Sequence, residues 1–211
     1  MNIEQFRAAA GISGESAERW FAEVTEAMDE FGINTPKRRA AFIAQVGTES
    51  AGFSRLTESF NYSVDGLVAT FPRRITLMEA RELGRRAGEK SVPLTRQMQI
   101  ADIVYGKRYG NNLAGDGWKF RGRGLKQITF HDNYLACGNA LRLDLVTNPD
   151  LLLTEENAAR SAAWFWNNVG CNQLADRDDF LGITKRINGG TNGLVDRQAR
   201  WAVAKSAFAA A

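Results

Sequence analysis

Glu49 and Glu58 are the two side chains of this sequence whose placement best fits acid–base chemistry. Phe42, Val46 and Phe53 fall at helical spacing from Glu49, so this glutamate shares the apolar stripe of a predicted helix. Burial on such a stripe disfavours a charged carboxylate and favours the protonated form that a general acid needs. The alternative interpretation places Glu49 at the edge of the stripe, where its carboxylate reaches water.

Glu58 can act together with Glu49 only if the chain turns between them. In an unbroken helix the two residues would lie about 13.5 Å apart along the axis and on opposite faces. Ser50-Ala51-Gly52 supplies a break, after which residues 53–60 can fold back. Polar residues surround Glu58 in the sequence, namely Thr57, Ser59, Asn61 and Tyr62. We expect them to keep Glu58 ionised and able to activate a water, and two such facing carboxylates are what hydrolysis of a glycosidic bond requires.

Three polar or glycine-rich clusters have the composition of a sugar-binding groove. They are Arg121-Gly122-Arg123-Gly124 with Gln127 and Thr129, then Asn133-Tyr134, then Ile187-Asn188-Gly189-Gly190. Amide and hydroxyl side chains can orient a water or bond a sugar hydroxyl, and glycines permit close approach of the backbone. Each cluster also has a structural interpretation: the arginine pair as a turn with solvated charges, and the asparagine before two glycines as the end of a helix.

Helices are predicted to position these residues. Start and stop signals bracket segments of helical period: Thr35 and Pro36 begin the helix that carries Glu49, and Thr76 with Glu79 forms a capping box. The predicted helices cover residues 13–31, 35–50, 76–84, 94–105, 133–141, 154–169, 180–187 and 196–209. Residues 115–129 differ, because repeated glycines and alternating aromatic or β-branched residues favour a strand or an extended loop. The expected fold is mainly α, with one small β element.

Length and composition indicate one globular domain, or one domain in two lobes. The chain has 211 residues, with 44% hydrophobic and 24% charged side chains. No stretch approaches the roughly 20 apolar residues of a membrane span, and the charged start is unlike a secretory signal. A metal site is not expected, since His131, Cys137 and Cys171 are the only histidine and cysteines. We expect two buried thiols, with a Cys137–Cys171 bridge as the alternative in an oxidising compartment.

The net charge of +3 conceals an uneven distribution. Residues 1–34 carry two basic and seven acidic side chains, whereas residues 73–126 carry thirteen basic and five acidic ones, a net charge of +8. A basic segment of this kind favours a polyanionic polymer, a membrane surface or nucleic acid as partner, although solvated helix faces explain it equally well. Nucleic acid is the weakest candidate, because the N-terminal third is acidic and RGRG occurs only once.

In their order and spacing, these clusters resemble glycoside hydrolase family 19, and within it they are most similar to the endolysins of tailed phages that infect Gram-negative bacteria. The resemblance covers nearly the whole chain and rests on residues 48–53 (TESAGF), 58, 61–63 (NYS), 121–129 (RGRGLKQIT), 133–134, 187–190 (INGG) and 196–197 (DR). It implies a lysozyme-like α domain in two lobes, with a main lobe at about residues 1–56 and 113–211 and a smaller inserted lobe at about 57–112. It also implies inverting hydrolysis of a β-1,4 bond beside an N-acetylhexosamine, without a cofactor, a metal or a separate wall-binding domain.

The same resemblance gives roles to individual residues. Glu49 matches the general acid, Glu58 the general base, and Thr129 the residue that helps to hold the attacking water. The predicted substrate-binding residues are Gln127, Tyr134, Asn188, Arg197, Tyr62 and Arg121, of which Arg197 matches an arginine near the catalytic acid. Thr48 is a departure, since many members have a histidine directly before the acid. We expect that change to affect local electrostatics more than the reaction.

The expected function is that of an endolysin, a muramidase-like enzyme that hydrolyses the β-1,4 bonds of bacterial peptidoglycan and so lyses the host cell. Peptidoglycan carries carboxylates, so the basic segment fits it better than neutral chitin. The alternatives are a chitinase of the same family, a lytic transglycosylase, which needs no base at Glu58, and a non-catalytic wall-binding or tail protein. The resemblance further leads us to expect a monomer without stable membrane insertion, held in the host cytoplasm until a separate membrane pore protein releases it.

Overall fold

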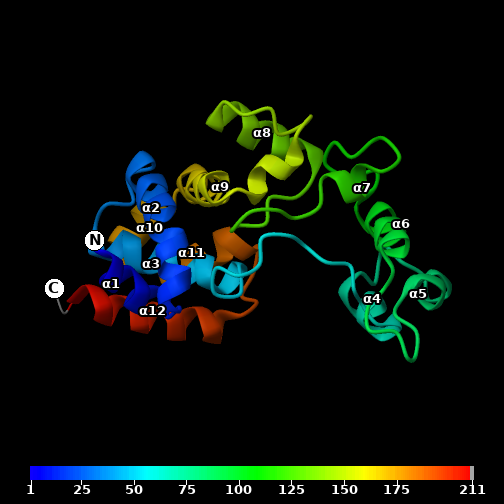
Figure 1. Ribbon diagram of the computed structural model, residues 1–211, viewed down its shortest axis with the longest axis horizontal. Coiled ribbons are helices and arrows are strands. Elements are labelled where there is room, and N and C mark those ends of the chain that lie inside the picture. The colour runs from blue at the N-terminus through cyan, green and yellow to red at the C-terminus, as the bar shows by residue number, and fades with distance from the viewer. Residues whose placement is uncertain (210–211) are drawn as a thin grey trace.

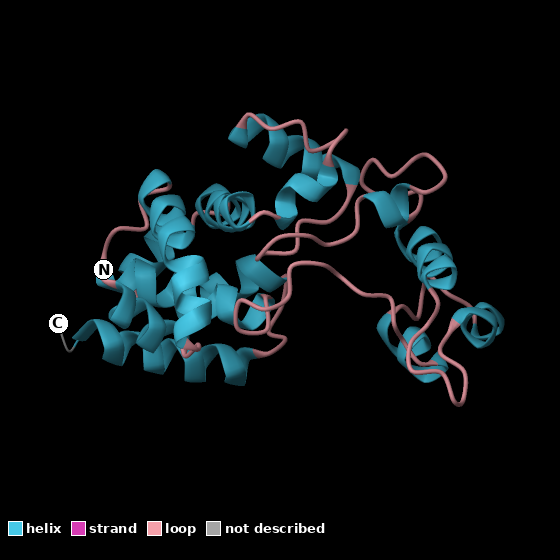
Figure 2. Ribbon diagram, in the orientation of Figure 1, coloured by secondary structure: helices cyan, strands magenta, loops and turns pink. Residues whose placement is uncertain are grey.

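The computed structural model describes residues 1–209, which form helices joined by loops (Figures 1 and 2). The helices are α1 (Ile3–Ala10), α2 (Gly14–Glu30), α3 (Pro36–Glu49), α4 (Val64–Thr70), α5 (Leu77–Leu83), α6 (Leu94–Tyr105), α7 (Asp116–Lys119), α8 (His131–Leu141), the 3-10 helix η1 (Pro149–Leu153), α9 (Glu155–Asn168), α10 (Cys171–Asp176), α11 (Phe180–Asn188) and α12 (Leu194–Ala209). Figure 1 shows α4, α5 and α6 gathered at one end of the molecule and both termini at the other. The mainly α prediction is confirmed.

Side-chain caps begin several helices where the sequence indicates. Ser13, Thr35 and Thr76 each accept a hydrogen bond from the backbone of the first helical turn, which satisfies an otherwise unpaired N–H group. Two predicted starts differ by two residues, because α8 begins at residue 131 and α12 at residue 194. Phe130 turns the chain into α8 with a φ of 75° and no side-chain cap, so capping signals do not mark that start.

Among residues 1–209, four α-helices and the 3-10 helix η1 lie outside the predicted segments, the four being α1, α4, α7 and α10. None of them exceeds eight residues, and hydrophobic periodicity is weak over so short a length. Two nevertheless have caps that the sequence contains: Asn2 forms a capping box with Gln5 at α1, and Ser63 caps α4.

The small β element predicted at residues 115–129 is reduced to isolated bridges within the described chain. Residues 116–119 form α7, and antiparallel bridges join Arg123 to Ile128 and to Thr57. Gly124 and Gln127 have φ values of 76° and 61°, and this left-handed backbone turns the chain before a strand can extend. The prediction of a strand or an extended loop is therefore wrong at residues 116–119, which are helical, whereas residues 120–129 form a loop.

The largest apolar cluster surrounds α3, the helix that ends at Glu49. Residues 40–47 of α3 are all buried, which explains why its apolar residues are not confined to one stripe. The helix packs mainly against α12 and also contacts α1, α9, α10 and α11. Phe42 meets Trp166 of α9 edge to face, with 5.5 Å between ring centroids. Burial on all sides fixes the direction of α3 and hence the place of its last residue.

Two further apolar clusters hold the remaining helices. One lies among α4, α5 and α6 and includes Phe60 and Val104, and the other lies around α8 and η1 and includes Phe120. The ring of Tyr105, which packs against the first of these clusters, lies 4.9 Å from that of Phe130. This contact brings the end of α6 against the loop at residues 120–130.

Both cysteines are free and buried, as expected, and they lie in different clusters. Burial raises the pKa of the Cys137 and Cys171 thiols to about 12. Among residues 1–209, no helix combines the length and apolar character needed to span a membrane, and His, Cys, Asp and Glu side chains nowhere gather in threes as a metal site would require.

Candidate active site

Glu49 is the last residue of α3, and the chain turns sharply directly after it. Ser50 is fully buried; its hydroxyl donates to the carbonyl of Val46 at 2.7 Å and accepts from the backbone N–H of Phe53 at 2.9 Å. Ala51, Gly52 and Phe53 follow with φ values of 51°, 71° and 63°. Three consecutive left-handed residues are rare outside glycine, so the hydroxyl of Ser50 and burial of the Phe53 ring must hold this turn. The predicted helix break after Glu49 is confirmed.

Two cations contact the Glu49 carboxylate. The Arg197 guanidinium donates to Oε1 at 2.5 Å, and the Lys126 ammonium lies 3.5 Å from Oε2. All three side chains are largely buried, with exposed fractions of 12% for Glu49, 14% for Lys126 and 4% for Arg197. Arg197 also donates to Gln45 and to the carbonyl of Asn192, so its donors are occupied by protein. It lies beside Glu49, as expected of the arginine near the candidate acid, and a direct contact of Arg197 with substrate stays a prediction.

Glu58 is held against the loop that follows α7. Its Oε1 accepts from the Tyr105 hydroxyl at 2.6 Å, its Oε2 accepts from the Gly122 N–H at 3.0 Å, and its own backbone N–H donates to the Gly122 carbonyl at 2.9 Å. Burial raises the pKa of Glu58, while the hydrogen bonds from Tyr105 and Gly122 and the charge of Arg121 oppose that rise. The groups that favour the ionised form of Glu58 are therefore Tyr105 of α6 and the loop, rather than the residues next to it in the sequence.

The loop at residues 122–126 connects the two carboxylates. Gly122 contacts Glu58 at one end of the loop, and Lys126 contacts Glu49 at the other. A side chain at Gly122 would collide with this arrangement, since an added Cβ would lie 2.8 Å from Gln127 Oε1 and 3.2 Å from Glu58 Oε2. Glycine is required there for close approach, and the structure brings both predicted catalytic glutamates to one segment.

Gln127, Thr129 and Asn133 line one pocket of about 430 Å³, which continues to Lys126. Trp164 and Phe165 of α9 form its apolar wall, with Asn168 at the edge. The Thr129 hydroxyl donates to the Gln127 carbonyl at 3.1 Å, so its oxygen can still accept a hydrogen bond. A pocket with an aromatic wall and several amide groups is chemically suited to a sugar ring.

Tyr134 and the RGRG segment bond to one another, although contact with a sugar was predicted for Tyr134 and Arg121. Tyr134 is fully buried; its hydroxyl donates to the Arg121 carbonyl at 2.6 Å and accepts from the Arg123 guanidinium at 2.9 Å. The Arg121 guanidinium lies 3.8 Å from the ring centroid of Trp118 and donates to its carbonyl. These residues fix the loop that holds Glu58, so the predicted sugar contact from Tyr134 is corrected to a positioning role.

Tyr62 and Asn188 stand apart from that pocket. Tyr62 is half-buried against Phe71, with 5.5 Å between ring centroids, and burial together with the charge of Glu58 raises the pKa of its hydroxyl. Asn188 ends α11, and its buried Oδ1 has no hydrogen-bond partner among residues 1–209. An unpaired buried acceptor needs a partner that the protein itself does not supply.

Tyr105 and Lys126 are functional candidates that the sequence analysis did not select. Tyr105 is the last residue of a correctly predicted helix, yet it meets Glu58 across 47 positions of sequence. Lys126 lies inside the recognised RGRGLKQIT run, but only the packing of α3 brings Glu49 beside it. Thr48, which precedes Glu49, donates to Asp196 at 2.7 Å, and Asp196 pairs with Arg200.

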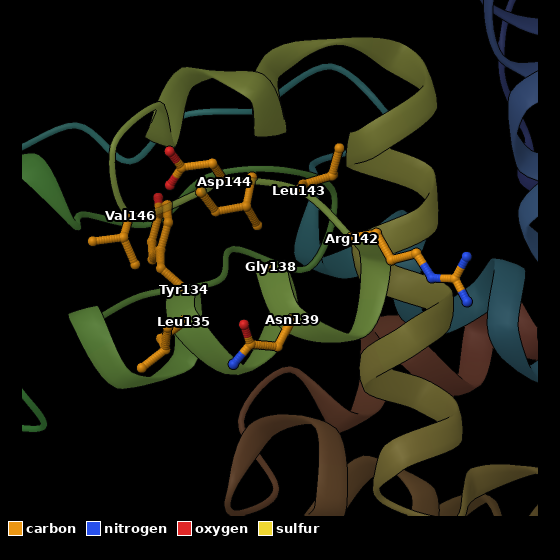
Figure 3. A pocket seen from close by; sticks show the side chains of 9 residues that line it. Tyr134, Leu135, Gly138, Asn139, Arg142, Leu143, Asp144 and Val146 are labelled. Carbon is orange, nitrogen blue, oxygen red and sulfur yellow. The ribbon is translucent and has the colours of Figure 1, made fainter.

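A second pocket, of about 420 Å³, lies on the opposite face of α8 (Figure 3). Tyr134, Leu135 and Asn139 line it from the helix, whereas Asn133 and Ala136 face the first pocket. Figure 3 shows Arg142 pointing away from Asp144. Neither glutamate borders this second pocket, so it is not where the candidate acid and base meet.

Comparison with known proteins supports one family. The family model described as "Chitinase class I" matches residues 96–190. A glycosyl hydrolase family 19 domain-containing protein of Haemophilus influenzae is 35% identical over 179 residues, covering 84% of this chain and 83% of the relative. Endochitinase 1 of Theobroma cacao is 37% identical over 100 residues, but the match covers only 38% of this chain and 31% of the plant protein.

Solved structures agree on the fold. A bacterial family 19 chitinase has a TM-score of 0.62 at 21% identity, with 98% of this chain and 94% of that chain covered. Chitinase C from Streptomyces griseus HUT6037 has a TM-score of 0.61 at 18% identity, with coverage of 99% and 76%. At these identities the likeness concerns the fold alone.

Proposed function

Because the chain belongs to glycoside hydrolase family 19 and is a glycoside hydrolase, we propose that it cleaves the β-1,4 bonds of bacterial peptidoglycan and acts as an endolysin. One observation carries the mechanism: two partly buried glutamates contact opposite ends of the same short loop, beside a pocket rich in amides. An acid and a base that serve one bond must be held in such a fixed relation.

Glu49 acts as the general acid in this mechanism. It gives its proton to the glycosidic oxygen as the bond to the anomeric carbon breaks. Loss of the proton leaves a negative charge on Glu49. Arg197 and Lys126, which already contact its two oxygens, stabilise that charge. Cations placed before the reaction stabilise charge that develops in the transition state.

Glu58 acts as the general base. It takes a proton from a water that attacks the anomeric carbon from the face opposite the leaving group. Its raised pKa makes it a stronger base, provided that it is ionised at the working pH. Thr129 accepts a hydrogen bond from the same water. Inversion requires space for that water, so we expect the carboxyl groups to lie roughly 6.5–9.5 Å apart when substrate is bound.

Peptidoglycan is our preferred substrate on grounds of charge. Residues 73–126 carry a net charge of +8, and peptidoglycan has carboxylates on its peptide stems, and on its lactyl groups where no stem is attached. Chitin, a neutral polymer, is the second candidate, and the names of the plant relatives and of the similar structures favour it. As an endolysin, the protein would act as a monomer and would reach the wall from the host cytoplasm through a separate membrane pore protein.

The first test is mass spectrometry of fragments released from purified Gram-negative peptidoglycan by the wild-type protein and by the E49Q and E58Q variants. We expect fragments that carry one added water at a reducing sugar, and a loss of at least roughly 100-fold in both variants, since each removes a proton-transfer group. Anhydro-sugar ends, or full activity of E58Q, would instead identify a transglycosylase. If wild-type protein released sugars from chitin alone, the chitinase alternative would replace our proposal.

A further inference from the structure

Among residues 1–209, Lys126 is the only charged residue that lines the pocket between α8 and α9. The polar groups beside it are neutral: Gln127, Thr129, Asn133 and Asn168. The other wall is apolar and includes Trp164 and Phe165. The pocket therefore has a single positive charge and no carboxylate, a composition that favours an anionic ligand over a neutral one.

The ammonium group of Lys126 pairs with Glu49, and its three N–H donors allow it to bind a second acceptor as well. Its nitrogen lies 3.5 Å from Glu49 Oε2, beyond the usual hydrogen-bond range of about 2.7–3.2 Å, and 4.6 Å from the ring centroid of Phe165. The side chain of Lys126 lies over the ring of Phe165. An ammonium group has three N–H donors, so the contact with Glu49 leaves donors for a ligand in the pocket. Lys126 borders this pocket and also the small crevice that contains Glu49.

The two other cations near the glutamates are held by protein groups, although the buried Nε of Arg121 has no hydrogen-bond partner among residues 1–209. Arg197 is 4% exposed and donates to Glu49, Gln45 and the Asn192 carbonyl. Arg121 is stacked on Trp118 and donates to its carbonyl. Lys126 is thus the cation placed to meet a charged substituent on a sugar bound beside Glu49.

We propose that Lys126 is a specificity-determining residue, which recognises a carboxylate on the 3-O-substituent of an N-acetylhexosamine bound next to Glu49. The proposal rests on peptidoglycan being the substrate and adds how that substrate is distinguished from chitin. The carboxylate belongs either to a free lactyl group or to the peptide attached to it. Both sources present the same group to the same ammonium.

The test compares kcat/KM on four substrates for wild-type protein, K126M, K126R and K90M. The substrates are glycan strands freed of peptides by an amidase, the same strands with their carboxylates amidated, peptide-bearing strands, and their amidated form. Lys90 is an exposed lysine of the same basic segment, so K90M removes an equal charge at a distance from the pocket. Thermal melting checks that each variant folds, and K126Q replaces K126M if the latter does not.

We expect wild-type protein and K90M to prefer charged over amidated strands by roughly 10- to 100-fold, the size of one charge-assisted hydrogen bond. K126M should lose this preference, through a higher KM on charged strands, and K126R should retain most of it. If the preference is found only on peptide-free strands, the carboxylate is that of the lactyl group. If it is found only on peptide-bearing strands, the carboxylate belongs to the peptide. The preference itself is a ratio, so a general disturbance of Glu49 would not change it.

Two results would overturn the inference. One is an equal loss by K126M on charged and amidated strands, which would give Lys126 a role toward Glu49 alone. The other is a wild-type protein that shows no preference at all. Failure of the proposed function is distinguishable from both, because the wild-type protein would then release no fragments from any of the four strands.

Discussion

At the scale of single residues, Glu58 is subject to opposing influences. Burial favours its neutral form, whereas the hydrogen bonds from Tyr105 and Gly122 favour the carboxylate. The Tyr105 ring is itself fixed by edge contacts with Phe60 and Phe130, at 5.5 Å and 4.9 Å. The hydroxyl that supports the carboxylate is therefore held in place before substrate arrives.

The substitution Tyr105→Phe removes that hydroxyl while it keeps the ring. Because the hydrogen bond lowers the pKa of Glu58, its loss raises that pKa, and a base that must be ionised then needs a higher pH. We expect the acidic limb of the kcat/KM profile to move to higher pH, with the largest loss of activity below neutrality. Tyr109→Phe is the control, since Tyr109 is 61% exposed and its ring also contacts Phe130. Coincident limbs for wild-type protein and Y105F would argue against a base at Glu58.

At the scale of elements, the end of α3 decides where Glu49 lies. Its cap residue, Ser50, uses one buried hydroxyl to join the last turn of the helix to the left-handed turn that follows. No other element in the described chain reverses direction through three consecutive non-helical residues with positive φ. The Ser50 hydroxyl thus adds to the packing of α3 in fixing where the candidate acid lies.

Ser50→Ala tests that contribution through stability. We expect the free energy of unfolding to fall by about 1–3 kcal/mol, because the buried N–H of Phe53 loses its partner. Activity on glycan strands should fall as well, since Glu49 shifts. In the matched control Ser54→Ala, an exposed hydroxyl of the same turn is removed, with an expected cost below about 0.5 kcal/mol. Urea unfolding of both variants measures the difference, and equal costs would contradict the proposed role of Ser50.

The elements also show what sequence reasoning can and cannot reach. Helices with side-chain caps, such as those begun by Ser13, Thr35 and Thr76, were predictable because the signal is local. The break after Glu49 was predictable for the same reason. The environment of Glu58 was not, because Tyr105 reaches it from another helix, and the burial of Tyr134 depends on how α8 packs against the loop. Contacts between distant segments depend on how the helices pack, and local sequence patterns such as caps do not predict that packing.

At the scale of the whole molecule, charge is separated along its length. The acidic residues 1–34 include α2, whereas the basic segment includes α5, and Figure 1 places these two helices in different parts of the molecule. Arg73, Arg81, Arg85, Arg86 and Lys90 of that segment are exposed. An anionic polymer is therefore attracted toward the α5 end.

Salt should weaken this attraction. We expect kcat/KM on peptidoglycan to fall several-fold as sodium chloride rises from roughly 50 to 300 mM, because the screening length shortens over that range. Cleavage of neutral chitin oligosaccharides, if measurable, should change little and serves as the control. Turbidity loss of purified sacculi gives the first rate and chromatography of oligosaccharides the second. Equal salt effects on both polymers would remove charge as a reason for preferring peptidoglycan.

The two thiols provide a means of following how the molecule opens. Cys137 lies in the apolar cluster around α8, and Cys171 lies in the cluster around α3. Each is shielded from an alkylating reagent until its own cluster separates, since a buried neutral thiol is inert. The order in which the two cysteines are labelled in mild denaturant would therefore report, without any introduced probe, which of the two apolar clusters unfolds first.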